Sequence, residues 1–256
     1  MTFNEIILGT SPFIFAPQFG HRTRLYELDF EKQPENIAEI LDKSYELGVH
    51  NILLNRSEDL EKALDMSIEH GNNWTVIAKT NVDNFEEDLE IFKKYNTTTI
   101  MLDGFFVDSN IEEENFDNIS RYLKKIKECG YTPAIETRTP FKNIPIIIES
   151  SIIDEFDEIM LPLNFYGYMM DCNFLNNENK EKINNILSSL DKKIIANRTL
   201  ATGILQVKEA YEFISTIEYV DSVCVGVAKV SEAEETFGII NEYKLWFFSF
   251  FLSFFY

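Results

Sequence analysis

The sequence is poor in positive charge, and this shortage excludes one class of partner. Only 23 lysines and arginines stand against 43 aspartates and glutamates, which gives a net charge of −20. Such a field repels phosphate backbones, so we expect no nucleic acid partner. Most of the acidic residues fall in helical patterns, where they are typical of a solvated face.

Cysteines are also scarce. The three of them, Cys129, Cys172 and Cys224, lie far apart and outside any CxxC or CxH pattern. This spacing argues against a disulfide framework or a zinc site, and it is typical of a reducing compartment. Because the N-terminus lacks the basic and apolar regions of a secretory signal, we expect a cytoplasmic location.

Short apolar, β-branched runs alternate with amphipathic helical patterns along the chain. The runs that predict strands are residues 5–10, 50–55, 74–80, 98–104, 132–138, 157–164, 193–197 and 221–228. The helical patterns that follow them are residues 34–48, 57–71, 84–95, 111–130, 144–151, 176–190, 205–217 and 231–243. A long phenylalanine-rich loop is expected between the first run and the first helix.

Near-continuous apolar strands with helices between them indicate a parallel sheet that is covered on its outer face. Eight such units in about 250 residues are the number that closes a (β/α)8 TIM barrel, and no linker-like segment divides them, so we predict a single domain. An open, doubly wound sheet is the alternative. No GxGxxG motif follows the first run, which counts against that alternative.

The barrel domain is expected to cover residues 1–243, and residues 244–256 form an apolar, aromatic tail. The tail is shorter than the stretch of about 20 apolar residues that a membrane-spanning helix needs, so we expect no integral membrane segment. Three interpretations of the tail stay open: packing on the barrel, contact with a membrane surface or a partner, and a non-native end.

Polar residues end several of the runs, where barrels of this kind carry their active sites. Lys79 and Asp103 end neighbouring strands, so we expect an ion pair in which a desolvated lysine could serve as acid, base or Schiff-base former. Glu136 is the third catalytic candidate. Arg138 lies two positions further along the same strand and faces the same side. Glu136 and Arg138 could therefore form an ion pair that only neutralises the two charges. A purely structural ion pair is the alternative for all of them.

Two segments lie where such barrels often bind phosphate, namely residues 198–203 after the seventh run and residues 226–231 after the eighth. Backbone N–H groups and separate cations make an anion site plausible there. The glutamates at positions 232, 234 and 235 favour plain helix capping instead. The cofactor-binding candidates at the rim are Arg138, Asn164, Asn197, Arg198, Gly203, Gly226 and Lys229.

Several of these segments together resemble the aldo/keto reductases. They are Gly9-Thr10-Ser11-Pro12, residues 48–52, Ile77-Ala78-Lys79, residues 196–205 and residues 223–235. The resemblance runs in order over most of the chain. It implies a (β/α)8 barrel that binds a nicotinamide cofactor at the strand ends and reduces carbonyls with a tyrosine acid, supported by aspartate, lysine and histidine. Lys79 stands at the position of the family's lysine.

The other family positions hold different residues. Leu53 replaces the aspartate, Asp103 replaces the histidine, and no tyrosine lies between Asn55 and the next helix. The residues Glu136-Thr137-Arg138 replace the serine and asparagine that hold the nicotinamide amide, and Asn197 replaces the aromatic residue that stacks on the ring.

We therefore expect a divergent oxidoreductase that uses NAD(P)H and acts on a small carbonyl compound. Carbonyl reduction needs a proton donor matched to the arriving hydride, and the rim offers no tyrosine for this role. Two alternatives stay open. One is a barrel enzyme without nicotinamide, of the lyase or isomerase type, that performs acid/base chemistry on a small anionic substrate. The other is a non-catalytic barrel for binding or assembly.

Overall fold

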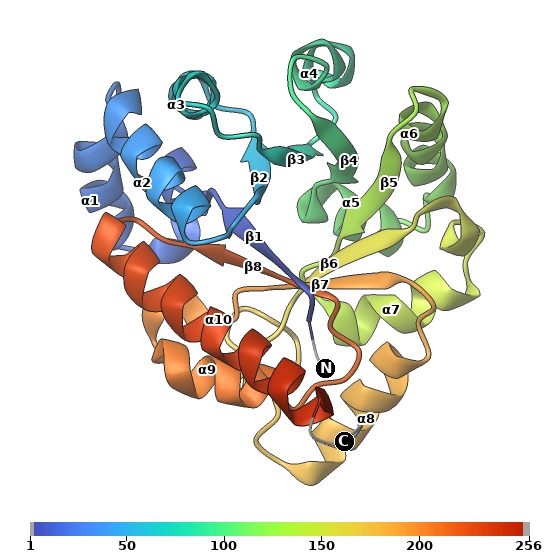
Figure 1. Ribbon diagram of the computed structural model, residues 1–256. Helices are drawn as coiled ribbons and strands as arrows, with labels where there is room; N and C mark the ends of the chain where they lie inside the picture. Colours follow the sequence, from blue (N-terminus) through green and yellow to red (C-terminus); the bar gives the residue numbers. More distant parts are fainter. Residues whose placement is uncertain (1–2, 253–256) are drawn as a thin grey trace.

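Eight parallel strands form a closed barrel in chain order, and the helices surround it (Figure 1). The computed structural model describes the backbone of residues 3–252 and the side chains of residues 3–243. Because β1 pairs in parallel with both β2 and β8, the sheet has no free edge. The predicted single-domain (β/α)8 TIM barrel is confirmed.

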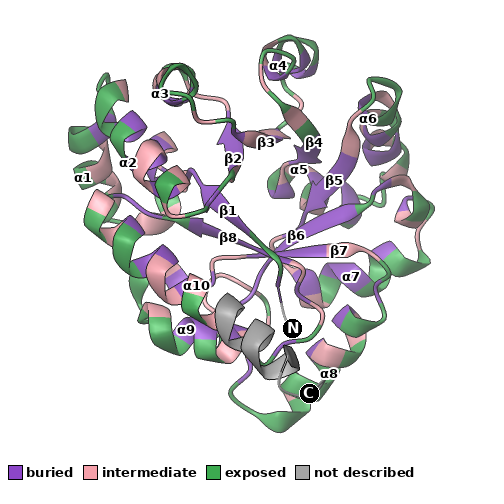
Figure 2. Ribbon diagram, in the orientation of Figure 1, coloured by how far each residue is buried: buried purple, intermediate pink, exposed green. Residues whose placement is uncertain are grey.

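All eight predicted runs form strands. They are β1 (Glu5–Gly9), β2 (Asn51–Asn55), β3 (Thr75–Thr80), β4 (Thr97–Leu102), β5 (Thr132–Glu136), β6 (Glu158–Pro162), β7 (Lys193–Asn197) and β8 (Ser222–Gly226). Most of their residues are buried (Figure 2). Helices cover the outer face of the barrel, and a cluster of apolar side chains fills its interior. This two-sided burial explains why the runs are apolar throughout.

The helices complete the βα units. They are α1 (Arg22–Phe30), α2 (Pro34–Glu46), α3 (Glu58–Glu69), α4 (Phe85–Phe92), α5 (Gly104–Glu112), α6 (Phe116–Glu128), α7 (Pro140–Glu149), α8 (Asn177–Ser188), α9 (Val207–Ile214) and α10 (Val230–Leu252). Four short 3-10 turns lie between them: η1 (Ser11–Ile14), η2 (Pro17–Phe19), η3 (Ile153–Glu155) and η4 (Ala201–Gly203).

Two predictions about helices were wrong. The expected loop after the first strand contains α1, which escaped detection because it buries only Phe30 and exposes Leu25 and Leu28, so it has no apolar stripe. The expected helix 111–130 is two helices, α5 and α6, separated at Glu114 by a left-handed backbone with φ of 55°. A continuous helix cannot pass through that conformation.

The last helix extends into the predicted tail, because α10 continues to Leu252. The three interpretations of the tail concern side chains of residues 244–256, which lie outside the described side chains. Within the described chain, no helix combines the length and the apolarity needed to cross a bilayer.

The interior of the barrel holds one buried side chain from every strand. These residues are Ile7, Leu53, Ile77, Met101, Ala134, Met160, Ile195 and Cys224. Successive residues of a strand point to opposite faces, so the residue two positions further on also points inward. The interior cluster therefore determines which side chains stand above it at the C-terminal rim.

Candidate functional site

The rim above the interior cluster is polar on four neighbouring strands and again on β7. Counting two positions on from each interior residue gives Gly9, Asn55, Lys79, Asp103, Glu136, Pro162, Asn197 and Gly226. Seven of these eight residues, all except Pro162, line one cavity of about 800 Å³. The apolar floor of that cavity includes Leu53, Met160 and Cys224.

The ammonium of Lys79 lies between two carboxylates. Lys79 Nζ is 3.1 Å from Glu136 Oε2 and 3.4 Å from Asp103 Oδ2. The predicted pair of Lys79 and Asp103 is confirmed, but the closer partner is Glu136 from β5. An ammonium has three N–H donors, so this arrangement leaves at least one for a ligand in the cavity.

Glu136 is held from three sides. Its Oε2 also accepts a hydrogen bond from the backbone N–H of Gly104 at 3.1 Å, and its Oε1 accepts one from the side-chain amide of Asn197 at 3.1 Å. The side chain of Glu136 is only 6% exposed. The expected pairing of Glu136 with Arg138 was wrong, because Arg138 lies beyond the end of β5, where the alternation of the strand no longer sets its direction.

Electrostatics keep both members of this pair charged. Burial disfavours the ammonium of Lys79, but the carboxylates of Glu136 and Asp103 outweigh that effect and raise the pKa of Lys79. Burial likewise opposes ionisation of Glu136, but Lys79 and Arg198 lower its pKa below the ordinary value. A Schiff base requires a neutral amine, so the geometry favours Lys79 as a fixed positive charge over the Schiff-base former considered from the sequence.

Asn197 leaves one buried acceptor unused. Its Nδ2 donates to Glu136, and its Oδ1 is buried without a hydrogen-bond partner among the described residues. A buried acceptor without a donor is costly, but this oxygen has almost no surface open to the cavity, so a ligand would reach it only if the amide turned.

Two arginines complete this end of the cavity. The guanidinium of Arg138 stacks on the exposed ring of Phe105, with 3.5 Å between its central carbon and the ring centroid. Arg198 follows β7 with a left-handed backbone, φ of 54°, and donates one hydrogen bond from its guanidinium to the carbonyl of Met169. Phe105 was not predicted, although its position directly after Asp103 and Gly104 was the available signal.

The other predicted cofactor residues divide into two groups. Gly203 and Gly226 line the cavity, together with Arg22 and Tyr26 of α1, which the sequence analysis missed because it expected a loop there. Asn164 does not line it. Its amide is fully buried and is used to hold the backbone of Tyr168 and the carbonyl of Arg198. Lys229 is exposed and also lies outside the lining.

The β8–α10 turn, where phosphate binding was considered, already holds a carboxylate. The backbone N–H of Ala228 donates to Oε2 of Glu232 at 2.8 Å. Glu232 and Glu235 both line that end of the cavity. Because the N–H group has an internal acceptor and the surrounding charge is negative, helix capping describes this turn better than anion binding does.

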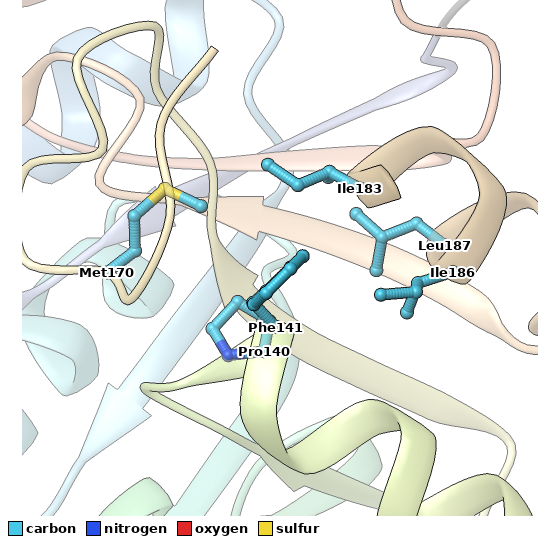
Figure 3. A pocket seen from close by; sticks show the side chains of 6 residues that line it. All are labelled: Pro140, Phe141, Met170, Ile183, Ile186 and Leu187. Atoms are coloured by element: carbon cyan, nitrogen blue, oxygen red, sulfur yellow. The ribbon is translucent and has the colours of Figure 1, made fainter. Parts of the chain in front are cut away.

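The cavity is distinct from a small apolar pocket between α7 and α8. That pocket holds only about 10 Å³, less than a bound water needs, and its side chains converge without a polar group among them (Figure 3). Its lining consists of Pro140, Phe141, Met170, Ile183, Ile186 and Leu187. No group of three or more metal-ligating side chains occurs among the described residues.

Comparison with protein-family models and with curated proteins finds no match. Solved structures do match. A Pseudomonas aeruginosa protein described as an aldo-keto reductase is 17% identical, with 94% of this chain and 91% of that chain covered and a TM-score of 0.63. Gox0644 in its apo form is 11% identical, with 91% and 82% covered and a TM-score of 0.58.

The barrel is also similar to a chain of the tryptophan synthase complex from Pyrococcus furiosus. That chain is 10% identical, with 95% of this chain and 96% of that chain covered and a TM-score of 0.52. At such low identity these likenesses show a shared fold, and the fold alone does not assign an activity.

Proposed function

We propose that the protein is an enzyme that acts on a small carbonyl compound, with the ammonium of Lys79 binding the carbonyl oxygen as it becomes negative. The observation that carries the proposal is the position of Lys79 Nζ, charged and facing the cavity between Glu136 at 3.1 Å and Asp103 at 3.4 Å. A charge that is held in place before the reaction stabilises a developing oxyanion without rearrangement of solvent.

The carboxylates around Lys79 give it this role in preference to proton transfer. Because they raise the pKa of Lys79, the ammonium is a weak acid that stays protonated. The same pair lowers the pKa of Glu136, which makes its carboxylate a weak base. Asp103, whose side chain is 20% exposed, accepts a hydrogen bond from the backbone N–H of Phe105 at Oδ1 and keeps Oδ2 beside Lys79, so it is the more accessible candidate for taking a proton from the substrate.

The reaction that follows depends on what attacks or leaves beside the oxyanion. In the oxidoreductase version, a bound nicotinamide would supply the hydride to the carbonyl carbon, and solvent in the cavity would supply the proton to the oxygen, because Lys79 keeps its own proton. The likeness to barrels described as aldo-keto reductases supports this version.

The β8–α10 end of the cavity is less suited to the phosphates of a nicotinamide nucleotide. Glu232 occupies the N–H of Ala228, and Glu235 adds a second negative charge to that end of the cavity. This arrangement disfavours any phosphate group of NADH or NADPH at the β8–α10 turn, so a bound nucleotide would place its phosphates elsewhere in the cavity.

The second candidate is an isomerase or lyase that forms an enolate without nicotinamide. Asp103 supports it, because its carboxylate lies beside the ammonium that would stabilise the enolate oxygen. Both versions give Lys79 the same task, and they differ in whether hydride or a substrate proton is transferred.

A screen of small aldehydes, ketones and oxo acids with two readouts separates the versions. Nicotinamide absorbance with NADH or NADPH reports reduction, and proton NMR in deuterium oxide reports exchange beside the carbonyl group. Absorbance change supports the oxidoreductase, and exchange without nucleotide supports the enolising enzyme. Silence in both readouts across the panel overturns the proposal and favours a barrel used for binding or assembly.

A further inference from the structure

Arg138 and Arg198 are unusual because they lack a carboxylate partner among the described residues, although the chain is rich in acidic residues. Acidic side chains outnumber basic ones by 43 to 23. Nevertheless, no carboxylate of the described residues lies within 4.0 Å of either guanidinium, although Lys79 in the same cavity has two. Two cavity arginines without a carboxylate are poorly explained by stability alone.

Arg138 is positioned without using its charge. Its backbone N–H donates to Asp108 Oδ2 at 2.9 Å, which fixes the turn after β5. Its stem packs against Gly104, where even a methyl group would come within 2.9 Å of Arg138 Cγ. The guanidinium then stacks on Phe105 and makes no hydrogen bond within the described chain. Its five N–H donors therefore have no partner among the described residues, and Arg138 lines the cavity.

Arg198 has a different support and the same surplus of donors. Its guanidinium donates to the carbonyl of Met169 at 2.8 Å, which uses one of five N–H groups. Its backbone adopts a left-handed conformation with φ of 54°, which turns the chain directly after β7. Arg198 therefore also directs unused donors toward the cavity.

We propose that Arg138 and Arg198 form a subsite that binds a carboxylate of the substrate, so that the carbonyl compound is an oxo acid. Guanidinium groups match the planar, two-oxygen geometry of a carboxylate. Among the residues that line this end of the cavity, Lys79, Arg138 and Arg198 exceed Asp103 and Glu136 by one positive charge, and Asp108 adds a third carboxylate outside the lining, so unpaired guanidinium donors attract a monoanion more than the net charge does. The carbonyl part of this proposal rests on the proposed function, and the carboxylate part does not.

Calorimetry with 2-oxobutyrate and butyrate tests the two parts separately. We expect the wild-type protein to bind both compounds, and to bind the oxo acid more tightly. Arg138→Gln removes the charge and should weaken both by about tenfold or more, because hydrogen bonds to charged groups are the strong ones. Lys79→Met should reduce the preference for the oxo acid over butyrate.

Arg121→Gln is the matched control, because Arg121 also stacks on a neighbouring ring, that of Tyr122 at 4.6 Å, but lies on the outside of α6. This variant should bind both compounds as the wild type does. Arg138→Lys keeps the positive charge and the aliphatic part of the side chain but removes the planar guanidinium. If the fold is intact, we expect an affinity for both compounds between those of the wild type and Arg138→Gln. Melting curves of each variant confirm the fold.

The outcomes are distinct. The subsite is overturned if Arg138→Gln binds 2-oxobutyrate and butyrate as tightly as the wild type does. It is also overturned if the wild type binds neither compound. Tighter binding of inorganic phosphate than of either carboxylate overturns the carboxylate as the anion. If Arg138→Gln weakens both compounds but Lys79→Met leaves their affinity ratio unchanged, the subsite stands and the role of Lys79 at the carbonyl is refuted.

Discussion

Lys79 on β3 and Glu136 on β5 meet across the rim of the barrel, with 3.1 Å between Nζ and Oε2, although β4 runs between their strands. Both side chains follow an interior residue by two positions, Ile77 on β3 and Ala134 on β5. Because the sheet closes into a barrel, the side chains at the C-terminal ends of β3 and β5 meet at the rim. The ion pair is thus a product of the barrel itself, and it fixes the charge that the proposed chemistry uses.

Loss of one partner of this pair should destabilise the fold. Glu136→Gln leaves the ammonium of Lys79 with Asp103 alone, and removing one member of a buried pair costs about 3 kcal/mol in free energy of unfolding. Urea titration measures the change, and the double variant Lys79→Met/Glu136→Gln should recover part of it. The matched control is Glu58→Gln, which removes the exposed partner of Lys62 and should leave stability unchanged.

The stability that the ion pair of Lys79 and Glu136 contributes should be lost at both acid and alkaline pH. The pKa of Glu136 is lowered, so its contribution is present above the unfolded value of about 4.3 and is lost as the pH falls through the folded value. The pKa of Lys79 is raised, so its contribution is present below about 10.4 and is lost as the pH rises through the folded value.

Urea midpoints of wild type and of the double variant, measured at acid, neutral and alkaline pH, test this dependence. The difference between the two proteins should be largest near neutral pH and should shrink toward both extremes. A difference that does not vary with pH would mean that Lys79 and Glu136 are not coupled.

The reactivity of Lys79 should be low at neutral pH. Reductive methylation with formaldehyde modifies neutral amines, and the carboxylates beside Lys79 keep its amine protonated. Mass spectrometry of peptides should find exposed lysines such as Lys62 and Lys182 methylated well before Lys79. In Glu136→Gln the delay of Lys79 methylation behind that of the exposed lysines should be shorter. Early labelling of Lys79 in the wild type would return it to the role of a Schiff-base former.

Gly104 should be essential for the shape of the site. A Cβ at this position would lie 2.9 Å from Arg138 Cγ and 3.1 Å from Glu136 Cγ. Gly104→Ala should therefore displace one of these stems and destabilise the protein by about 1–3 kcal/mol, as overpacking does.

Gly238→Ala is the matched control for Gly104→Ala. In α10 a Cβ at Gly238 would meet no atom within 4 Å, so alanine should stabilise the helix by about 0.5–1 kcal/mol. Opposite signs for the two variants in urea titration are the expected result. Equal effects would show that close packing at Gly104 does not matter.

Glu232 should keep phosphate out of the β8–α10 turn. Glu232→Ala frees the N–H of Ala228, so we expect inorganic phosphate to raise the melting temperature of this variant more than that of the wild type. The variant should also lose about 1 kcal/mol of stability with its cap. Glu234→Ala removes a charge from the same turn without touching Ala228 and should show neither effect. An equal rise of the melting temperature with phosphate in the wild type and in Glu232→Ala would contradict the capping role.

The fold followed from the sequence because its signals are local. The strands are apolar runs with both faces buried, and alternation within each run places Lys79, Asp103 and Glu136 on the inside. The partner of Glu136 could not be predicted in the same way. It depends on how the closed sheet is staggered, including a shift in register between Val76 and Ile77 on β3 that no local pattern reveals.

The arginines show the limit of sequence analysis most clearly. Arg138 was assigned to the face of Glu136, but it lies after the last residue of β5, and its direction is set by Asp108, Gly104 and Phe105. These contacts come from α5, which was itself missed because it begins directly after β4 without a recognisable loop. The role of Arg198 similarly depends on the carbonyl of Met169 in a separate loop.

The most direct test of the account is the effect of Lys79→Met on the reaction that the carbonyl screen detects. Removing a preorganised donor to an oxyanion typically lowers kcat by about 100-fold to 1000-fold, and we expect a loss of this size with a much smaller change in KM. Circular dichroism checks that the variant is folded. A folded Lys79→Met protein that keeps the wild-type kcat would contradict the central claim that the ammonium of Lys79 stabilises the oxyanion.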